Sequence, residues 1–205
     1  MEISVERTHL PGVLLLLVLH QEHGARSLDT VTPSKVTYTT CHTCPGNLTT
    51  QIRNKLKQLN GSADGLLTLY CIAQGEPFPS EVDKMCGSGL TDFPPFNAHG
   101  RKEAMMKELY CIVTYLTTSL GNITRDQKSL NPQDRNLHGQ LDFVATIMQQ
   151  LQSNVLCLLY KDKVDHVGEC YGPNTLGKTF FQKKRLGCQV LFKYKQVITE
   201  LYQAF

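Results

Sequence analysis

Residues Gly172 to Thr179 match GxxxxGK[ST], the phosphate-binding pattern of nucleotide-dependent enzymes, and a helical pattern follows them. In such enzymes a buried parallel strand delivers the loop, and the backbone amides of the loop then cradle phosphate groups. This chain shows no alternation of strand and helix patterns. The match therefore predicts a loop that precedes a helix. A nucleotide-dependent enzyme is the competing hypothesis, to be tested by ATP titration of a Lys178→Ala variant.

Cys41 and Cys44 have the spacing of a CxxC motif, which serves as a redox dithiol or as half of a zinc site. The chain has no second CxxC, and no two of the histidines beyond the N-terminal leader stand four residues apart. Those histidines are His42, His99, His138 and His166. Neither a GxSxG elbow nor an HExxH helix is present. The sequence thus predicts no catalytic constellation, metal or cofactor, and it favours two separate disulfides for the two cysteines.

The composition places the chain among exported globular proteins. Of its 205 residues, 41% are hydrophobic and 19% are charged, which is enough apolar material for a core and excludes a disordered chain. The net charge of +3 lacks the basic footprint of a nucleic-acid-binding protein. Eight cysteines in a chain of this length indicate an oxidising compartment.

An apolar run from Leu10 to Leu19 is too short for the roughly 20 residues that span a bilayer, and it is typical of the core of a signal peptide. We expect residues 1–26 to form this leader, with cleavage at 24–26, and residues 27–205 to form one soluble extracellular domain without membrane insertion. A buried core helix is the alternative interpretation of the run. Three sequons, at Asn47, Asn60 and Asn122, predict N-glycosylation.

Four apolar stripes with helical spacing predict four helices of about 20 to 27 residues. The second is expected to end at Gly121, and the third to begin at Asn131-Pro132, with Asn131 as its N-cap. A capping box of Thr179 and Gln182 is expected to open the fourth. The stripes are Leu48, Ile52, Leu56, Leu59, Leu66 and Tyr70; Met105, Leu109, Ile112, Leu116 and Leu120; Leu137, Leu141, Val144, Met148, Leu151, Val155 and Leu158; and Val190, Tyr194, Val197, Leu201 and Phe205.

The connections between these helices predict the topology. They contain about 29, 11 and 17 residues, and a connection of about 30 residues runs the full length of a helix, so the first and second helices can be parallel, as can the third and fourth. The stretch from Gln74 to Gly100 is rich in proline and glycine and is expected to be irregular. We therefore predict an all-α, long-chain four-helix bundle of the up-up-down-down type, with two long crossover loops.

Phe181 and Lys184 form the most suggestive pair of side chains outside the predicted core. They stand three residues apart at the start of the fourth helix and so share one face, away from the apolar stripe. An exposed aromatic ring beside a cation resembles a binding hot spot. The alternative is a ring tucked under the neighbouring loop, within a basic run, Gln182 to Arg185, that is only a solvated face.

Several longer segments are similar to the interleukin-6 family of cytokines, in particular to its leukaemia inhibitory factor branch. They are Gln58-Leu-Asn-Gly-Ser, Ala73-Gln-Gly-Glu-Pro-Phe-Pro, Thr91-Asp-Phe-Pro-Pro-Phe, Thr118-Ser-Leu-Gly-Asn-Ile-Thr-Arg-Asp-Gln-Lys, Ser153-Asn-Val-Leu-Cys, Tyr171-Gly-Pro, Phe181-Gln-Lys-Lys and Leu186-Gly-Cys-Gln. The resemblance implies a secreted, monomeric ligand rather than an enzyme. Such a ligand brings the leukaemia inhibitory factor receptor and the shared receptor glycoprotein 130 together, which triggers Janus kinase and STAT signalling that controls growth, differentiation and survival. An oncostatin-like or cardiotrophin-like ligand is the alternative.

The resemblance also implies two receptor-binding surfaces. An FxxK motif that binds the private receptor falls on Phe181 and Lys184, flanked by Lys178 and Pro77. The residues implied for the shared receptor are Gln51, Asn54, Gln58, Gln150 and Asn154. The first three of these are spaced three and four apart and therefore share a helix face, which a plain solvated face would also do.

The cysteine pairs that the resemblance implies are Cys44 with Cys157 and Cys86 with Cys188. The helical partner of a third family pair is replaced here by Tyr160, so Cys170 is expected to pair with Cys41 instead. Cys71 and Cys111 look additional. They either bridge the first two helices or remain free.

Overall fold

The computed structural model describes residues 44, 46–164, 168 and 170–205. The expected signal peptide, Cys41 and His42 lie outside this part of the chain. The helices are α1 (Leu48–Gln74), α2 (Val82–Cys86), α3 (Lys102–Leu130), α4 (Arg135–Lys161) and α5 (Phe180–Ala204). Over the same residues there is no strand, and no helix is both long and apolar enough to cross a membrane.

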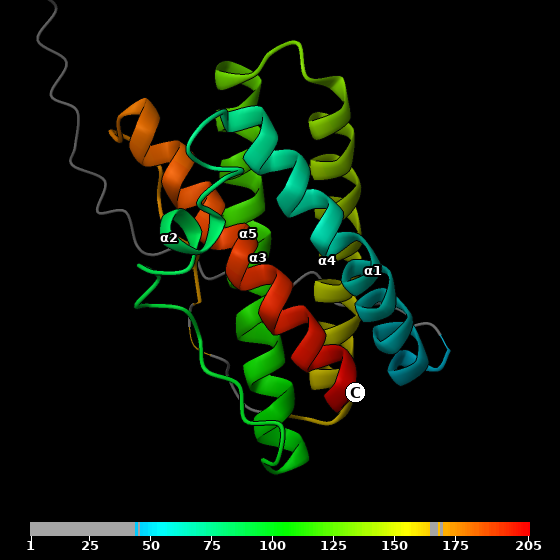
Figure 1. Cartoon of the computed structure of the whole chain (residues 1–205). Coiled ribbons are helices and arrows are strands. Elements are labelled where there is room, and N and C mark those ends of the chain that lie inside the picture. The colour runs from blue at the N-terminus through cyan, green and yellow to red at the C-terminus, as the bar shows by residue number, and fades with distance from the viewer. Residues whose placement is uncertain (1–43, 45, 165–167, 169) are drawn as a thin grey trace, which may run out of the picture. The chain divides into compact units, whose positions relative to one another are not determined.

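The four long helices have the predicted up-up-down-down arrangement. In Figure 1, α1 and α3 run upward and α4 and α5 run downward. The antiparallel pairing of α1 with α5 brings Tyr194 Oη to Leu59 O at 3.0 Å and Tyr70 Oη to Lys184 O at 3.1 Å. The C-terminal ends of α1 and α3 lie at the same end of the bundle, where Gln74 Nε2 donates to Gln127 Oε1 at 3.0 Å, as two helices that run in the same direction require.

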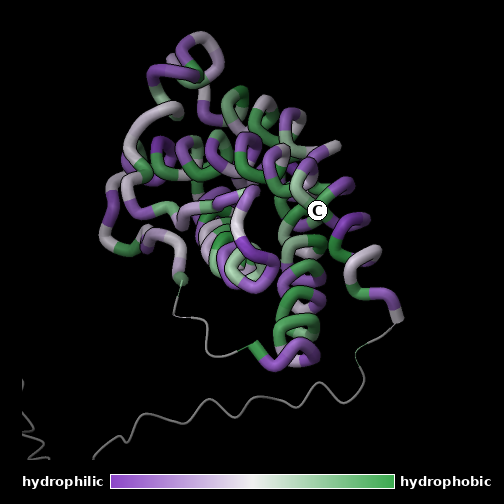
Figure 2. The backbone as a smooth tube through the Cα atoms, turned by 90° about the horizontal axis from the view of Figure 1, so that it is seen from below, coloured by the Kyte–Doolittle hydropathy of each residue, from purple (hydrophilic) through white to green (hydrophobic). Residues whose placement is uncertain are grey.

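Each long helix buries one apolar face in a shared core. In Figure 2, hydrophobic and hydrophilic positions alternate around the helices, which is the pattern of helices that are half buried. The prediction for α4 is confirmed at all seven positions, since every residue of its stripe is at most 9% exposed. The capping box of α5 is confirmed as well, because Thr179 and Gln182 each satisfy a backbone N–H of the other.

The predicted boundary between the second and third helices is wrong. Helix α3 continues through Gly121 to Leu130, because Ile123, Asp126 and Gln127 lie on its buried face and favour further turns. Asn131 is the C-cap of α3 rather than the N-cap of α4. The N-cap of α4 is Asp134, whose carboxylate accepts a hydrogen bond from Leu137 N at 3.0 Å.

The long connection between α1 and α3 is not irregular throughout. It contains α2, a single short helix that the sequence pattern did not reveal. The Cys86–Cys188 disulfide ties α2 to α5, and the Cys44–Cys157 disulfide ties the residues before α1 to the end of α4. The structure thus contains both pairs that the resemblance implied.

The expectation for Cys170 is wrong, since it is bonded to Cys111 of α3 rather than to Cys41. The reason is that the segment after Cys170 lies along α3, where Gly172 N donates to Thr118 Oγ1 at 2.7 Å and Asn122 Nδ2 donates to Pro173 O at 3.1 Å. A Cβ atom on Gly172 would overlap Ser119 Oγ, so this close approach requires glycine. The alternative of a Cys71–Cys111 bridge is also excluded, and Cys71 is a free, buried thiol.

Two helical glycines should respond in opposite ways to substitution by alanine. A Cβ atom on Gly187 would lie 2.8 Å from Tyr70 Cζ in the core, whereas one on Gly121 would meet no atom within 4 Å. We expect Gly187→Ala to destabilise the fold by about 1–3 kcal/mol through overpacking. Gly121→Ala should stabilise it by about 0.5–1 kcal/mol, since alanine loses less backbone entropy in a helix.

Urea unfolding followed by circular dichroism, with the wild type as reference, measures both changes. Equal effects of the two substitutions would contradict the close approach of α1 and α5 at Gly187.

Candidate functional site

The first turn of α5 presents two adjacent aromatic side chains at the surface. Thr179 Oγ1 accepts a hydrogen bond from Gln182 N at 3.3 Å, and Gln182 Oε1 accepts one from Thr179 N at 2.9 Å, so the start of α5 is fixed. Phe180 is 72% exposed and Phe181 is 52% exposed. Two adjacent exposed rings form an apolar patch, and such a patch points to an interaction site more strongly than a single exposed side chain does.

The ring of Phe181 is supported from one side by Phe78. Their ring centroids lie 6.0 Å apart at an interplanar angle of 50°, and Phe78 is itself only 2% exposed. Phe78 is placed by the tight turn that ends α1, where Gly75 has a φ of 74° and accepts a hydrogen bond from Phe78 N at 3.1 Å. The ring of Phe181 is therefore oriented by the protein but still half open to solvent. The alternative hypothesis, a ring tucked under the neighbouring loop, is therefore correct only for the side of Phe181 that packs against Phe78.

Lys184 lies on the same face, and its ammonium group is held by the end of α1. Lys184 Nζ donates to Gln74 O at 3.1 Å. Gln74 is the last residue of α1, where free carbonyl groups and the helix dipole both favour a positive charge. An ammonium group has three N–H donors, so this contact orients Lys184 and leaves donors for another partner.

A buried polar network below this surface fixes α5 against α1. Tyr70 Oη donates to the backbone carbonyl of Lys184 at 3.1 Å and accepts from Gln127 Nε2 at 3.3 Å. Burial, aided by the nearby Cys71 and Asp126, raises the pKa of Tyr70 far above its usual range, so the hydroxyl keeps its proton. The network therefore holds the backbone from which Lys184 projects.

Pro77 and Lys178 are the other two residues predicted for the private-receptor surface. Pro77 directly precedes Phe78 and is partly buried, and Lys178 is exposed one residue before the N-cap of α5. Lys183 points elsewhere, to an ion pair with the buried Asp126 at 3.1 Å. Sequence spacing predicted the shared face of Phe181 and Lys184 correctly. It missed Phe78 and Gln74, whose only sequence signal was their place beside the Gly75-Glu-Pro77 turn.

The five residues of the second predicted surface lie on α1 and α4, which run antiparallel to each other. Asn54, Gln58 and Gln150 are exposed, and Gln51 and Asn154 are partly buried. Lys55 Nζ donates to Gln150 Oε1 and so joins the two helices within this surface. Sequence reasoning missed Lys55, although it stands four residues after Gln51 and three before Gln58, which is the spacing of one helix face.

The motifs that suggested catalysis have other roles in the described residues. The amide of Gly172 donates to Thr118 Oγ1 of α3, and the hydroxyl of Thr179 caps α5, so the GxxxxGK[ST] match spans a loop and a helix start. Cys44 is in a disulfide and offers no thiolate to a metal. The sulfur atoms of Cys71, Cys86 and Cys188 lie within 4.8 Å of one another, but the last two are bonded to each other.

A comparison with models of known protein families matches residues 47–205 to the family described as LIF / OSM family. The match spans all five helices, from the N-cap of α1 to the last residue of the chain. It therefore includes both surfaces described above.

Removing the hydroxyl group should have different effects on stability at two buried tyrosines, Tyr70 and Tyr115. Tyr70 Oη makes the hydrogen bonds given above, whereas Tyr115 Oη has no hydrogen-bond partner in the described structure. We expect Tyr70→Phe to lower the free energy of unfolding by about 1–3 kcal/mol, because it leaves buried groups unsatisfied. Tyr115→Phe should leave it unchanged or raise it by about 1 kcal/mol.

Denaturant unfolding at pH 7 measures both free energies of unfolding. Both hydroxyl groups are protonated at this pH, because burial also raises the pKa of Tyr115, to about 12. A larger loss in Tyr115→Phe than in Tyr70→Phe would reverse the roles assigned to the two residues.

Proposed function

The chain belongs to the LIF / OSM family, and from this premise we propose that it is a secreted ligand that brings the leukaemia inhibitory factor receptor and glycoprotein 130 together. The family consists of helical cytokines, which are not enzymes. Signalling would follow inside the target cell through Janus kinases and STAT proteins, and would control growth, differentiation and survival.

The observation that carries this proposal is the paired presentation of Phe181 and Lys184. One side of the Phe181 ring rests on Phe78, and the other is free to enter an apolar receptor pocket. Lys184, already oriented by Gln74 O, has donors left for an acidic or carbonyl group of the receptor. Side chains held in this way lose little conformational freedom on binding, which favours affinity.

Lys178 and Pro77 would form the rim of this contact. Lys178 is exposed beside the start of α5, and its charge would guide the approach of an acidic receptor surface more than it would add affinity. Pro77 holds the turn that carries Phe78, so its contribution would be to the shape of the contact.

The shared receptor would bind the α1 and α4 surface that contains Gln51, Asn54, Gln58, Gln150 and Asn154. Its residues on α1 lie in the first half of the helix, whereas Gln74 of the other surface is the last residue. At 1.5 Å per residue, Gln58 and Gln74 are about 24 Å apart along the helix axis. Two receptor chains can therefore contact the ligand at once without competing for the same residues.

Export and glycosylation are part of the same proposal. Asn47 Oδ1 caps α1 by accepting from Thr50 N at 3.2 Å, and Asn60 Oδ1 accepts from Thr199 Oγ1 at 2.8 Å. Both bonds use the side-chain oxygen and so persist when the amide nitrogen carries a glycan. We propose glycosylation at these two sites on a monomer released after removal of residues 1–26. We propose it also at Asn122, where the amide nitrogen bonds Pro173 O and keeps one N–H for that bond when it carries a glycan.

The alternative within the family is an oncostatin-like or cardiotrophin-like ligand. The proposed ligand and this alternative differ in the private receptor that the surface around Phe181 would bind. Binding of the mature chain to the separate receptor ectodomains, each immobilised in turn, distinguishes them.

Phe181→Ala should weaken binding to the leukaemia inhibitory factor receptor ectodomain by about 30-fold or more, the effect of a hot-spot aromatic worth ~2 kcal/mol. Phe180→Ala is the matched control, since Phe180 is the adjacent and even more exposed ring. We expect it to change affinity by less than about threefold, as for a residue outside the hot spot. Surface plasmon resonance with the mature protein measures both.

Circular dichroism must show equal helicity in the two variants. Similar losses in both, or full affinity in Phe181→Ala, would contradict the assignment of Phe181 as the central contact.

Gln58→Lys should weaken binding to glycoprotein 130 by about fivefold or more, because it buries an unpaired charge in the contact. Binding to the leukaemia inhibitory factor receptor should stay unchanged. Gln203 of α5 is also exposed, and Gln203→Lys adds the same charge elsewhere, so we expect it to alter neither affinity. Binding to each ectodomain and STAT phosphorylation in responsive cells are the measurements. If Gln58→Lys retained full affinity for glycoprotein 130, the α1 and α4 surface would have to be abandoned as its binding site.

A further inference from the structure

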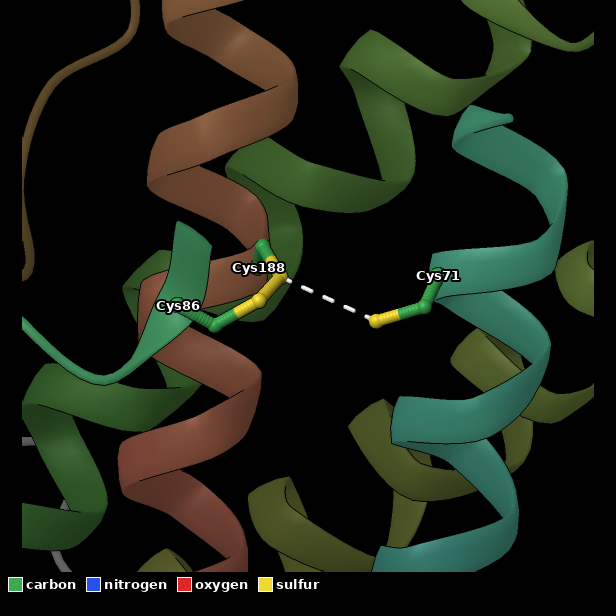
Figure 3. A group of neighbouring side chains, drawn as sticks. All are labelled: Cys71, Cys86 and Cys188. Atoms are coloured by element: carbon green, nitrogen blue, oxygen red, sulfur yellow. Dashed lines mark hydrogen bonds between the residues drawn. A yellow bond between two sulfur atoms is a disulfide. The ribbon is translucent and has the colours of Figure 1, made fainter. Parts of the chain in front are cut away.

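Three sulfur atoms from three helices meet in the core. The thiol of Cys71 on α1 lies 3.7 Å from the sulfur of Cys188 on α5, which is bonded to Cys86 on α2 (Figure 3). All three sulfur atoms are within 4.8 Å of one another, and the three residues are at most 2% exposed. The proposed receptor contacts do not use this cluster.

We propose that these cysteines form an internal thiol–disulfide exchange site, in which Cys71 displaces Cys86 from Cys188. The Cys71 thiolate attacks Cys188 Sγ, the Cys86–Cys188 bond breaks, and the Cys71–Cys188 bond forms. Cys86 leaves as a thiolate and takes up the proton that Cys71 lost. The reaction exchanges one disulfide and one thiol for another such pair, so it needs no oxidant or reductant.

The packing of the helices brings the reacting sulfurs together. A separation of 3.7 Å between Cys71 and Cys188 is already a contact distance, and the neighbouring residues Tyr70 and Gly187 mark the close approach of the same two helices. Because the thiol is confined beside the bond it attacks, the exchange within one chain avoids the entropic cost of bringing two molecules together. The Cys71 side chain must still move into line with the Cys86–Cys188 bond to attack it, since its sulfur also lies within 4.8 Å of Cys86 Sγ. Burial of all three residues also disfavours attack by an external thiol.

A small groove reaches Cys71. It has a volume of about 240 Å³ and is also lined by the exposed Ile72, the ion-paired Asp64 and Lys195, and Pro79 and Val82. The opposite charges of Asp64 and Lys195 therefore compensate each other, and Tyr70, which precedes Cys71, is neutral. Burial raises the pKa of Cys71 to about 11, so the thiolate is scarce at neutral pH and exchange should be slow there.

The exchange would move a crosslink from one part of the fold to another. In the structure the disulfide joins α5 to α2, in the connection after α1. After exchange it would join α5 directly to α1 and leave α2 with a free thiol. The chain would then exist as two covalent isomers with the same mass.

The first test removes the competing cysteine. In secreted Cys86→Ala protein, non-reducing peptide mapping should find a Cys71–Cys188 disulfide. In the matched Cys71→Ser/Cys86→Ala variant, Cys188 should carry a free thiol. Free Cys71 and Cys188 thiols in Cys86→Ala protein of native helicity would overturn the proposal.

The second test follows the wild type itself. Samples are incubated without oxidant at pH 7–10, quenched with acid, denatured, labelled with N-ethylmaleimide and mapped. Label should appear on Cys86 at a rate that is independent of protein concentration and rises about tenfold per pH unit below the pKa of Cys71. Cys71→Ser protein is the control and should leave Cys86 unlabelled. Labelling of Cys86 that equals this control at every pH, or that depends on protein concentration, would refute exchange within the chain.

Discussion

The packing of the Tyr70 ring against Gly187 sets the distance between α1 and α5, and most of the functional geometry depends on that distance. The absence of a Cβ atom on Gly187 lets α5 come close enough for Tyr70 Oη to reach the carbonyl of Lys184. The same approach lets the side chain of Lys184 reach the end of α1 and places Cys71 beside Cys188. The lack of a Cβ atom on Gly187 thus helps to position both the ammonium group of Lys184 and the buried sulfur atoms of Cys71 and Cys188.

Polar groups at the C-terminal ends of α1 and α3 fix the axial position of the helices, which apolar packing alone does not fix. Apolar stripes hold four helices together but tolerate small shifts along their axes, because dispersion and burial are not directional. The hydrogen bonds among Tyr70, Gln74 and Gln127 are directional, and each is buried. These bonds join α1 to α3, and Tyr70 also donates to Lys184 O of α5. Displacing any of these three helices would therefore leave polar groups without their partners. The network therefore fixes the axial position of the helices that carry the proposed private-receptor surface.

Much of the fold could be predicted because its determinants are local. The α4 stripe and the Thr179 capping box are patterns within one helix, and both are confirmed. The predicted stop at Gly121 failed because burial further along α3 outweighs the modest helix cost of an exposed glycine. The pairing of Cys170 with Cys111 depends on hydrogen bonds between backbone and side-chain groups of distant segments, which leave no periodic signal. For the same reason the sequence indicated the face shared by Phe181 and Lys184 but not their supports, Phe78 and Gln74.

The contact between Lys184 and Gln74 has a consequence for how this surface can diverge among related proteins. The ammonium group is held by a main-chain carbonyl, which every amino acid supplies. Side chains around the end of α1 can therefore change in evolution while the orientation of Lys184 persists. Selectivity for different receptors can then evolve in the neighbouring loop residues, on a cationic contact whose geometry is inherited with the backbone.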